Sequence, residues 1–331
     1  MKPADLKKYI SFYERERKII DAKLALALKG RNPASLYQPA SYILESSGKR
    51  LRPLLVLLSA KAVGGNIKNF YNAALSVEML HNFTLVHDDI MDNADLRRGN
   101  LTIHKKYNLN TAILTGDILA AVAYEFLLKD CKVNAKQALD SFTKGLVEVC
   151  EGQSLDTEFE TRKNVSLPEY IKMIEKKTAA LARMCCELGA YLADGSKNDI
   201  KALSNYGKYL GIAFQIQDDL LDIIADKSEF GKRIGGDLVE GKKTFLFIEA
   251  LEKAKGKDKD DLLKVVANKG IKENQIEYYK NLYEKLGVID DAKAAIRSYT
   301  NKALGSINKL SNKSEVEIFY WLADSLIKRN K

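Results

Sequence analysis

Two aspartate clusters of the same form are the residues of this chain best suited to do chemistry. They read Asp88-Asp89-Ile90-Met91-Asp92 and Asp218-Asp219-Leu220-Leu221-Asp222, and each ends a long apolar run. Residues four apart stack on one face of a helix, so Asp88 should lie above Asp92, and Asp218 above Asp222. Five or six carboxylates in an apolar setting repel one another and cannot all ionise without cations. Magnesium, which prefers oxygen ligands and shares such sites with a substrate's phosphates, is the expected partner.

The alternative interpretation is a pair of solvated acidic helix ends. One cluster alone would leave the two interpretations about equal. Two clusters of equal spacing, each after an apolar helix, favour the metal site.

Basic residues near the first cluster indicate a phosphate ligand. Gly48-Lys49-Arg50-Leu51-Arg52-Pro53 places three cations at the start of an apolar helix. Helix N-termini already carry positive partial charge, so these cations cost stability unless an anion is present. The functional interpretation is a diphosphate pocket, and the alternative is an ordinary basic turn.

Two adjacent arginines follow the first cluster in the loop Asn93-Ala94-Asp95-Leu96-Arg97-Arg98-Gly99-Asn100. They can point to opposite sides of the loop, and guanidinium groups bind phosphate oxygens bidentately. The alternative is that they pair with Asp92 and Asp95.

Helical periodicity dominates the rest of the chain and predicts an all-α protein. Apolar residues recur at helical spacing in residues 4–29, 67–92, 110–130, 134–160, 198–224 and 245–331. The chain has only five prolines and no strand pattern of convincing length. Within the helix that starts near Ser166, the step Lys177-Thr178 indicates a kink or a polar site, and the alternative is an exposed lysine next to an ordinary helical threonine. Three glycines in residues 230–236 indicate a loop.

Bulk composition describes a soluble globular protein. The 331 residues are 46% hydrophobic and 29% charged, with 53 Lys and Arg against 44 Asp and Glu and a net charge of +9. We expect most of the basic excess to be a solvated surface. No aromatic-basic module or zinc spacing supports nucleic acid as a partner.

Four cysteines without metal-ligand spacing indicate reduced packing residues in a cytoplasmic protein. The first residues lack the apolar core of a signal peptide, and no apolar run approaches membrane-spanning length. We therefore expect a cytoplasmic protein without stable membrane insertion.

Taken together, these features resemble the trans-isoprenyl diphosphate (polyprenyl) synthases, most of all the archaeal-type geranylgeranyl diphosphate synthases. The resemblance rests on seven short motifs in order between residue 48 and about residue 244. Besides the two aspartate clusters, the matching residues are Gly48, Lys49, Arg52 and Pro53; Arg97, Arg98 and Gly99; Gly152, Gln153 and Asp156; Lys177 and Thr178; and Phe214, Gln215, Asp218 and Asp219.

The resemblance implies a fold: a single domain over residues 1–331, built as one large helical bundle around a deep central cavity, and a homodimer. It implies a metal site of three Mg²⁺ ions, with ligands drawn from Asp88, Asp89, Asp92, Asp156, Asp218, Asp219 and Asp222. Arg97, Lys177 and Lys242 would hold the diphosphate of the allylic substrate. Lys49, Arg52, His81 and Arg98 would hold that of isopentenyl diphosphate. In the glycine-rich loop, Lys232 or Arg233 would close over the site.

The implied reaction is prenyl transfer from dimethylallyl, geranyl or farnesyl diphosphate to isopentenyl diphosphate, giving mainly geranylgeranyl diphosphate. Negative charge builds on the leaving oxygens, so metal ions and cationic side chains lower the barrier, with Asp88 and Asp218 central to the metal site. The allylic cation would be stabilised by the Thr178 hydroxyl, the Lys177 carbonyl and the Gln215 amide.

Product length would be set by the fifth and fourth residues before Asp88, which are Phe83 and Thr84. One aromatic there, with no insertion in the motif, is typical of the archaeal-type geranylgeranyl synthases. On an ideal helix Thr84 lies almost below Asp88, whereas Phe83 points about 140° away. Phe83 could therefore also be an ordinary core aromatic.

Three alternatives stay open. The product could be farnesyl diphosphate or a mixture. A class I terpene cyclase shares the first motif, but the second motif and Lys49 and Arg52 argue against it. A non-catalytic partner subunit of a heteromeric synthase usually loses one acidic motif, and both are intact here.

Overall fold

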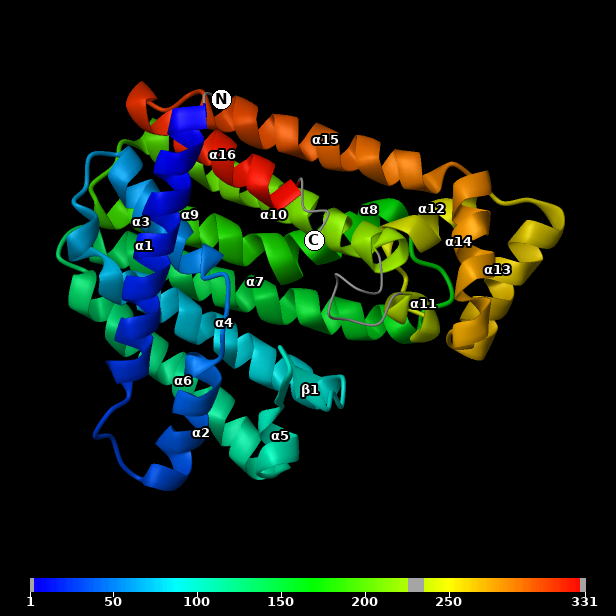
Figure 1. The fold of residues 1–331 in the computed structure, drawn as a ribbon, viewed down its shortest axis with the longest axis horizontal. Helices are drawn as coiled ribbons and strands as arrows, with labels where there is room; N and C mark the ends of the chain where they lie inside the picture. The colour runs from blue at the N-terminus through cyan, green and yellow to red at the C-terminus, as the bar shows by residue number, and fades with distance from the viewer. Residues whose placement is uncertain (1–2, 226–234, 328–331) are drawn as a thin grey trace. The chain divides into compact units, whose positions relative to one another are not determined.

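The computed structural model describes residues 3–225 and 235–327, and it is 80% helical with 1% strand (Figure 1). The expected all-α class is confirmed. The chain divides into two compact units, each made of three segments. Unit 1 comprises Met1–Thr143, Met184–Ser204 and Lys309–Ile318, and unit 2 comprises Lys144–Arg183, Asn205–Asn308 and Phe319–Lys331.

Unit 1 holds most of the N-terminal elements. They are α1 (Pro3–Ala27), α2 (Ala34–Glu45), α3 (Leu51–Ala62), η1 (Ile67–Asn69), α4 (Tyr71–Met91), β1 (Leu96–Arg97), β2 (Asn100–Leu101), α5 (Ile103–Lys106), α6 (Leu109–Asp130) and η4 (Lys313–Glu315). Unit 2 holds α8 (Leu167–Ile174), η2 (Glu175–Ala179), α11 (Gly236–Val239), α12 (Phe245–Lys253), α13 (Gly256–Asn268), η3 (Glu273–Gln275), α14 (Ile276–Lys285) and α15 (Val288–Ile307). The boundary falls within α7 (Ala135–Thr161), α9 (Ala180–Leu192), α10 (Lys197–Ile224) and α16 (Val316–Ile327).

Helix α4 ends directly after the first aspartate cluster because Asn93 adopts a left-handed conformation (φ 47°). The Asn93 N–H donates to the Ile90 carbonyl, and the Ala94 N–H donates to the Asp89 carbonyl. These two bonds form a Schellman motif, which satisfies carbonyls that the helix end leaves open. The cluster therefore occupies the last turn of α4, where the helix dipole is negative and carboxylates are least stable.

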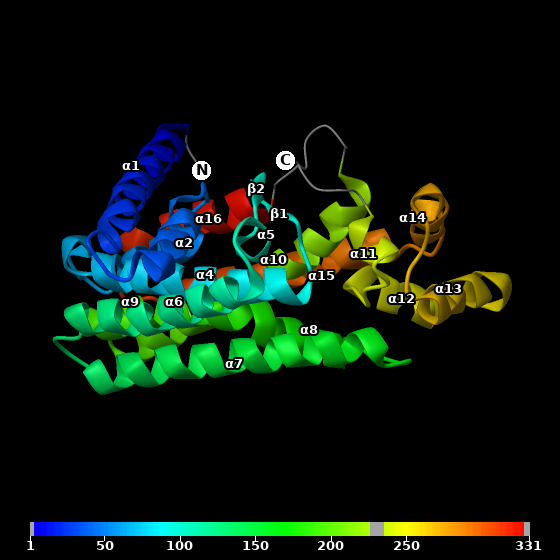
Figure 2. The same ribbon diagram turned by 90° about the horizontal axis from the view of Figure 1, so that it is seen from below.

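Helices α4 and α6 lie side by side within unit 1 (Figure 2). Leu80 and Met79 of α4 are fully buried, and each such side chain contributes about 1.5–3 kcal/mol. On α6, Gly116 permits a close approach, because a Cβ there would lie 2.2 Å from His87 Nε2. A larger residue at 116 would push the two helices or the His87 ring apart.

Helix α6 corrects the expectation that no apolar run reaches membrane-spanning length. Within the described ranges it is the one helix long and apolar enough to span a membrane, with a mean hydropathy of 1.6. That measure concerns length and composition only, and 44% of the window is buried inside the protein. Polar residues are interspersed in α6, so the apolar run is difficult to recognise in the sequence.

In unit 2, helix α8 starts with the capping box that its sequence predicts, and the Ser166 N–H donates to Glu169 Oε2 at 2.9 Å. Helix α8 leads directly into η2, a single π-helical turn over Glu175–Ala179. Such turns interrupt the regular hydrogen-bond ladder and are frequent at functional sites. The step Lys177-Thr178, where the sequence predicts a kink or a polar site, lies in this turn.

Candidate active site

The first aspartate cluster meets a β-hairpin that presents the two adjacent arginines. Strands β1 and β2 pair antiparallel, and Arg98 and Gly99 form the turn with positive φ angles of 53° and 79°. Arg97 Nε lies 2.6 Å from Asp89 Oδ1, whereas Arg98 Nη1 donates to the Ser47 carbonyl at 3.0 Å. The two arginines thus contact different partners, as expected, but Arg97 pairs with Asp89 rather than with Asp92 or Asp95.

Asp89 is buried, and the ion pair with Arg97 involves only one of its two carboxylate oxygens. It is 1% exposed, and burial raises its pKa. Within the described residues, its Oδ2 is buried without a hydrogen-bond partner. Asp88 is half-buried, and Asp92, the C-cap, is exposed. This is a set of hard oxygen donors at the negative end of a helix, which fits a divalent cation.

The basic stretch of residues 48–53 forms a cluster with His81 of α4. Arg52 Nη1 lies 3.0 Å from His81 Nε2. A guanidinium only donates, so His81 Nε2 accepts and its proton resides on Nδ1. Lys49 is held through its backbone, since its carbonyl accepts from the Tyr13 hydroxyl at 2.8 Å. Arg52 and His81, which the sequence expects to share one diphosphate, are therefore adjacent.

Burial and nearby positive charge both lower pKa values in this cluster. Burial, followed by the charge of Arg52 and then of Arg98, holds the pKa of His81 well below its ordinary value. Desolvation lowers the pKa of Arg98, and the nearby guanidinium of Arg50 lowers it further. The folded unit therefore gathers positive charges at a cost in free energy, and an anion bound there would relieve that cost.

Arg50 is a residue that the sequence argument counted only as a cation. It is 4% exposed and left-handed (φ 46°), and its guanidinium bonds Asp21, Glu78 and the carbonyls of Leu44 and Ser46 at 2.6–2.9 Å. Since it lies between Lys49 and Arg52, these bonds anchor the loop that carries both. Its acidic partners, Asp21 and Glu78, are 29 and 28 residues away, so no local pattern distinguishes Arg50 from its basic neighbours.

The candidate site of unit 2 is a pocket of about 130 Å³ around the π-helical turn. Its lining includes Asp156, Tyr170, Lys177, Thr178, Gln215, Asp219, Asp237, Lys242, Lys243 and Thr244. Lys177 Nζ forms an ion pair with Asp156, and the Thr178 hydroxyl donates to Gln215 Oε1 at 2.8 Å. Lys242 lies 2.8 Å from Glu240. The pocket thus brings together Asp219 and five other residues that the sequence predicts for the site, namely Asp156, Lys177, Thr178, Gln215 and Lys242.

Two glycines allow helices to approach the π-helical turn. A Cβ on Gly152 of α7 would lie 2.2 Å from the Lys177 nitrogen, and one on Gly211 of α10 would lie 2.5 Å from Ala179 Cα. Backbone atoms cannot move aside as a flexible side chain can. Close packing therefore explains why the motif has a glycine at position 152. The sequence did not identify Gly211, which has the same role.

The second aspartate cluster is held by protein donors. Gln215 Nε2 donates to Asp219 Oδ1, and the Tyr170 hydroxyl donates to Asp219 Oδ2. Burial, and then the nearby Asp237 charge, raises the pKa of Asp219 to about 7. Asp222 accepts from the N–H groups of Gly236 and Asp237 at 3.2 Å. Asp218 is half-buried. Tyr170 and Asp237 carry no motif signal and were missed from the sequence.

A metal ion would need ligands beyond those of one cluster. Across the described ranges, no group of three His, Cys, Asp or Glu side chains could hold an ion. Magnesium usually binds through one or two carboxylates and completes its shell with water and substrate phosphates. The two aspartates four residues apart in each cluster could supply such a pair of carboxylates.

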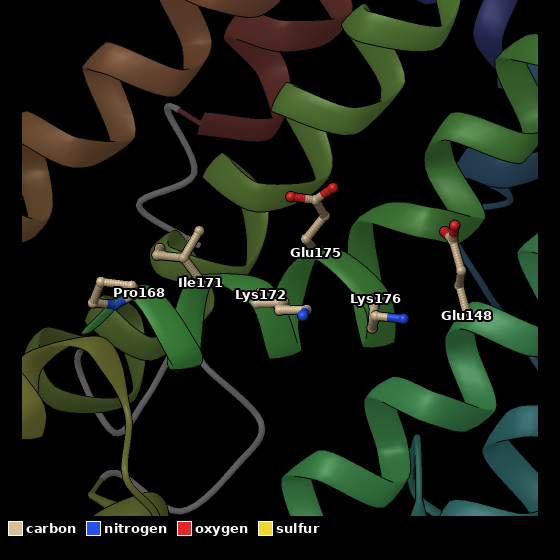
Figure 3. Close-up of a pocket in the computed structure, with 6 residues that line it drawn as sticks. All are labelled: Glu148, Pro168, Ile171, Lys172, Glu175 and Lys176. Carbon is tan, nitrogen blue, oxygen red and sulfur yellow. The ribbon is translucent and has the colours of Figure 1, made fainter. Parts of the chain in front are cut away.

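A second and larger pocket of about 380 Å³ in unit 2 contains none of the predicted residues (Figure 3). Its lining residues are Glu148, Pro168, Ile171, Lys172, Glu175 and Lys176. Three of its charged groups are already paired: Glu148 with Arg183, Glu175 with Lys208 and Lys176 with Glu151. Volume is therefore a poorer guide here than the convergence of polar groups in the smaller pocket.

The expected product-length residues make different contacts on α4. The Phe83 ring packs edge-on against His87, with centroids 4.8 Å apart. The Thr84 hydroxyl donates to the His81 carbonyl at 2.8 Å. His87 in turn contacts Gly116 of α6, so Phe83 is supported from one side by a ring with little room to move. Lys232 and Arg233 lie outside the described residues.

Comparison with known proteins gives one consistent result. The polyprenyl synthetase family model matches residues 33–285. The geranylgeranyl diphosphate synthase of Sulfolobus acidocaldarius is 39% identical over 302 residues, covering 89% of this chain and 91% of the relative. That of Methanosarcina mazei is 38% identical, covering 94% of each. The crystal structure of geranylgeranyl pyrophosphate synthetase from Pyrococcus horikoshii is 35% identical with a TM-score of 0.91, covering 98% of this chain and 99% of that one.

Proposed function

Because the chain belongs to the polyprenyl synthetase family and is a prenyltransferase, we propose that it makes mainly geranylgeranyl diphosphate. The substrates would be isopentenyl diphosphate and an allylic diphosphate (dimethylallyl, geranyl or farnesyl), with diphosphate as the second product. The family resemblance inferred from the motifs is confirmed, and the fold is the all-α isoprenoid synthase type. We retain the single domain over residues 1–331 as a proposal, because the family match runs through segments of both units.

The cationic cluster of unit 1 is the observation that carries this proposal. Arg52, Arg98 and His81 are held together although burial, and then neighbouring guanidinium groups, lower the pKa values of His81 and Arg98. A diphosphate would turn that repulsion into attraction through bidentate hydrogen bonds. With Lys49 in the same loop, we assign this cluster to isopentenyl diphosphate. In the same unit, Arg97 would serve the allylic diphosphate.

The family is generally magnesium-dependent. We propose three ions, with Asp88 and Asp92 as ligands in unit 1 and Asp156 and Asp218 in unit 2. Bound magnesium would neutralise the charge that develops on the leaving diphosphate. The sequence predicts Asp89, Asp219 and Asp222 as further ligands, and in this structure they accept hydrogen bonds from Arg97, Tyr170 and backbone N–H groups. The Mg²⁺ dependence of an Asp219→Asn variant decides whether Asp219 is a ligand.

Prenyl transfer needs no nucleophilic side chain. The allylic carbon–oxygen bond breaks, and the diphosphate leaves with the electron pair. The π electrons of isopentenyl diphosphate form the new carbon–carbon bond, and the departed diphosphate takes the proton that is then lost. Lys177 and Lys242 would hold the leaving diphosphate. The Thr178 hydroxyl oxygen, the Lys177 carbonyl and Gln215 Oε1 would place partial negative charge beside the cation.

We propose that Phe83 limits the product length and that Thr84 leaves room beside it. The contact of Phe83 with His87 supports this, because a braced ring can act as a wall. Farnesyl diphosphate, or a mixture, is the alternative product. A non-catalytic partner subunit is the alternative from another class, and the presence of both aspartate clusters disfavours it.

We further propose a cytoplasmic homodimer. The exposed apolar side chains of α6 support association with a second copy, namely Leu109, Ile113, Leu114 and Leu128, which are 41–55% exposed. Such a face is costly in water unless it is covered. Size-exclusion chromatography with light scattering tests the oligomeric state.

One assay tests the proposed function. The purified protein is incubated with Mg²⁺, isopentenyl diphosphate and each allylic diphosphate in turn, and the products are separated by chain length. Geranylgeranyl diphosphate as the main product supports the proposal. Cyclic products would indicate a cyclase, and no product with any primer would leave the partner-subunit alternative.

A further inference from the structure

Asp219 is buried in unit 2 and surrounded by protein hydrogen-bond donors. Asp219 is only 5% exposed, and Tyr170 is 2% exposed. Oδ2 accepts from the Tyr170 hydroxyl and, at 3.1 Å, from the Phe245 N–H. Oδ1 accepts from Gln215 Nε2 at 3.1 Å. Three donors from α8, α12 and α10 therefore fix the plane of this carboxylate.

The fixed carboxylate also fixes the amide of Gln215. In this structure Gln215 turns its NH₂ group toward Asp219, because Gln215 Nε2 donates to Asp219 Oδ1. Its Oε1 is then the atom that accepts from the Thr178 hydroxyl at 2.8 Å. In the reversed orientation, the amide would present its NH₂ group to Thr178 and its oxygen to the carboxylate. One side of the pocket would then change from partial negative to partial positive charge.

We propose that Tyr170 is a positioning residue for prenyl transfer, holding the Gln215 amide in its working orientation through the Asp219 carboxylate. This inference rests on the proposed function, in which Gln215 Oε1 and Thr178 lie beside the allylic cation. Tyr170 touches neither substrate nor ion in this role. Its hydroxyl is the donor most easily removed, because the Phe245 N–H belongs to the backbone and Gln215 is the group being oriented.

The first test is Tyr170→Phe with Tyr283→Phe as the matched control. Tyr283 is equally buried, in the same core cluster, but within the described ranges its hydroxyl has no partner. We expect Tyr170→Phe to lower kcat about tenfold or more, as loss of a hydrogen bond to a charged group does, with KM for isopentenyl diphosphate unchanged. Tyr283→Phe should keep wild-type kcat. Equal kcat values in the two variants would overturn the inference.

A double-mutant cycle shows whether Tyr170 acts through Gln215. In a Gln215→Ala background, Tyr170→Phe should cause no further loss of kcat. An undiminished loss in that background would mean that Tyr170 contributes through general packing, and the inference would fail.

Asp219→Asn is a second test of the same role, in case Tyr170→Phe does not fold, and it leaves Tyr170 in place. We expect a lower kcat at an unchanged half-saturating Mg²⁺ concentration. A higher Mg²⁺ requirement would make Asp219 a metal ligand and contradict the positioning role. Wild-type protein without prenyl transfer would instead refute the proposed function, so the two failures are distinguishable.

Discussion

The candidate sites of the two units differ in how their charged side chains are arranged. In unit 1, burial and then the nearby charges of Arg52 and Arg98 lower the pKa of His81. In unit 2, the carboxylates are partnered within the protein: Asp156 by Lys177, and Asp219 by Tyr170. The cluster in unit 1 thus keeps like charges close together, as we propose for an anion site, whereas the charges of the unit 2 pocket are paired within the protein.

The difference indicates what ligand binding must do in each unit. In unit 1 a diphosphate would relieve the crowding of like charge at Arg52 and Arg98, but Arg97 must leave Asp89 if it is to hold a second diphosphate. In unit 2 the Lys177–Asp156 ion pair must open if Lys177 is to hold a diphosphate and Asp156 a metal ion. We therefore expect variants of the Arg52, Arg98 and His81 cluster in unit 1 to act mainly on substrate affinity, and variants of the pocket in unit 2 mainly on turnover.

The largest expected effect comes from removing one carboxylate in each unit. Asp88→Ala and Asp218→Ala should each lower kcat about a hundredfold or more, the loss typical of removing a group that stabilises developing charge. Both proteins should keep the wild-type circular dichroism spectrum. Asp95→Ala, in the exposed loop after α4, is the control and should retain activity. Near-normal turnover in either variant would remove that unit's aspartate from the proposed metal site.

A smaller effect on a different parameter is expected for the cationic cluster. Arg52→Ala should raise KM for isopentenyl diphosphate about ten- to a hundredfold, because it removes charge-assisted hydrogen bonds. Arg52→Lys should recover only part of the loss, since lysine lacks the bidentate fork. Arg297→Ala, an exposed arginine of α15, is the control. If kcat falls while KM stays constant, the proposed division of roles between this cluster and the unit 2 pocket is wrong.

Product length should change without loss of turnover when the Phe83 ring is removed. Phe83→Ala should give a main product longer than geranylgeranyl diphosphate. His87→Ala should shift the distribution in the same direction but less, because it removes only the ring that braces Phe83. Chromatography of the dephosphorylated products measures both. A Phe83→Ala enzyme that stops at the wild-type length would show that Phe83 is a core aromatic.

The smallest effect concerns pH and His81. Its pKa in the folded protein is lowered by burial and by Arg52, Arg98, Arg97 and Arg50. Below about pH 6.5 the unfolded chain binds a proton at this residue while the folded protein does not, so acidification favours unfolding. His81→Gln, which stays neutral, should lose less thermal stability than wild type between neutral and mildly acidic pH. Parallel melting curves for the two proteins across that range would argue against the crowded cationic cluster.

Local sequence determined the helices and the chemistry. Apolar periodicity predicted the helices over residues 67–92 and 198–224, and they are observed as Tyr71–Met91 and Lys197–Ile224. The spacing of each aspartate cluster identified the chemical class, because i and i+4 positions share a helix face whatever surrounds them. The Lys177-Thr178 step marked the π-helical turn. These features depend on neighbours along the chain, which a sequence displays directly.

The partners of each charged group were decided only by the tertiary structure. Tyr170 and Asp219 are 49 residues apart, and nothing near either one indicates the bond between them. Arg50 differs from Arg52 only in what burial places around it, which is Asp21 and Glu78 for Arg50 and His81 for Arg52. Gly152 and Gly211 are explained by backbone atoms of the π-helical turn that lie on another helix. Burial and long-range packing set these contacts, and with them which charges are crowded and which are neutralised.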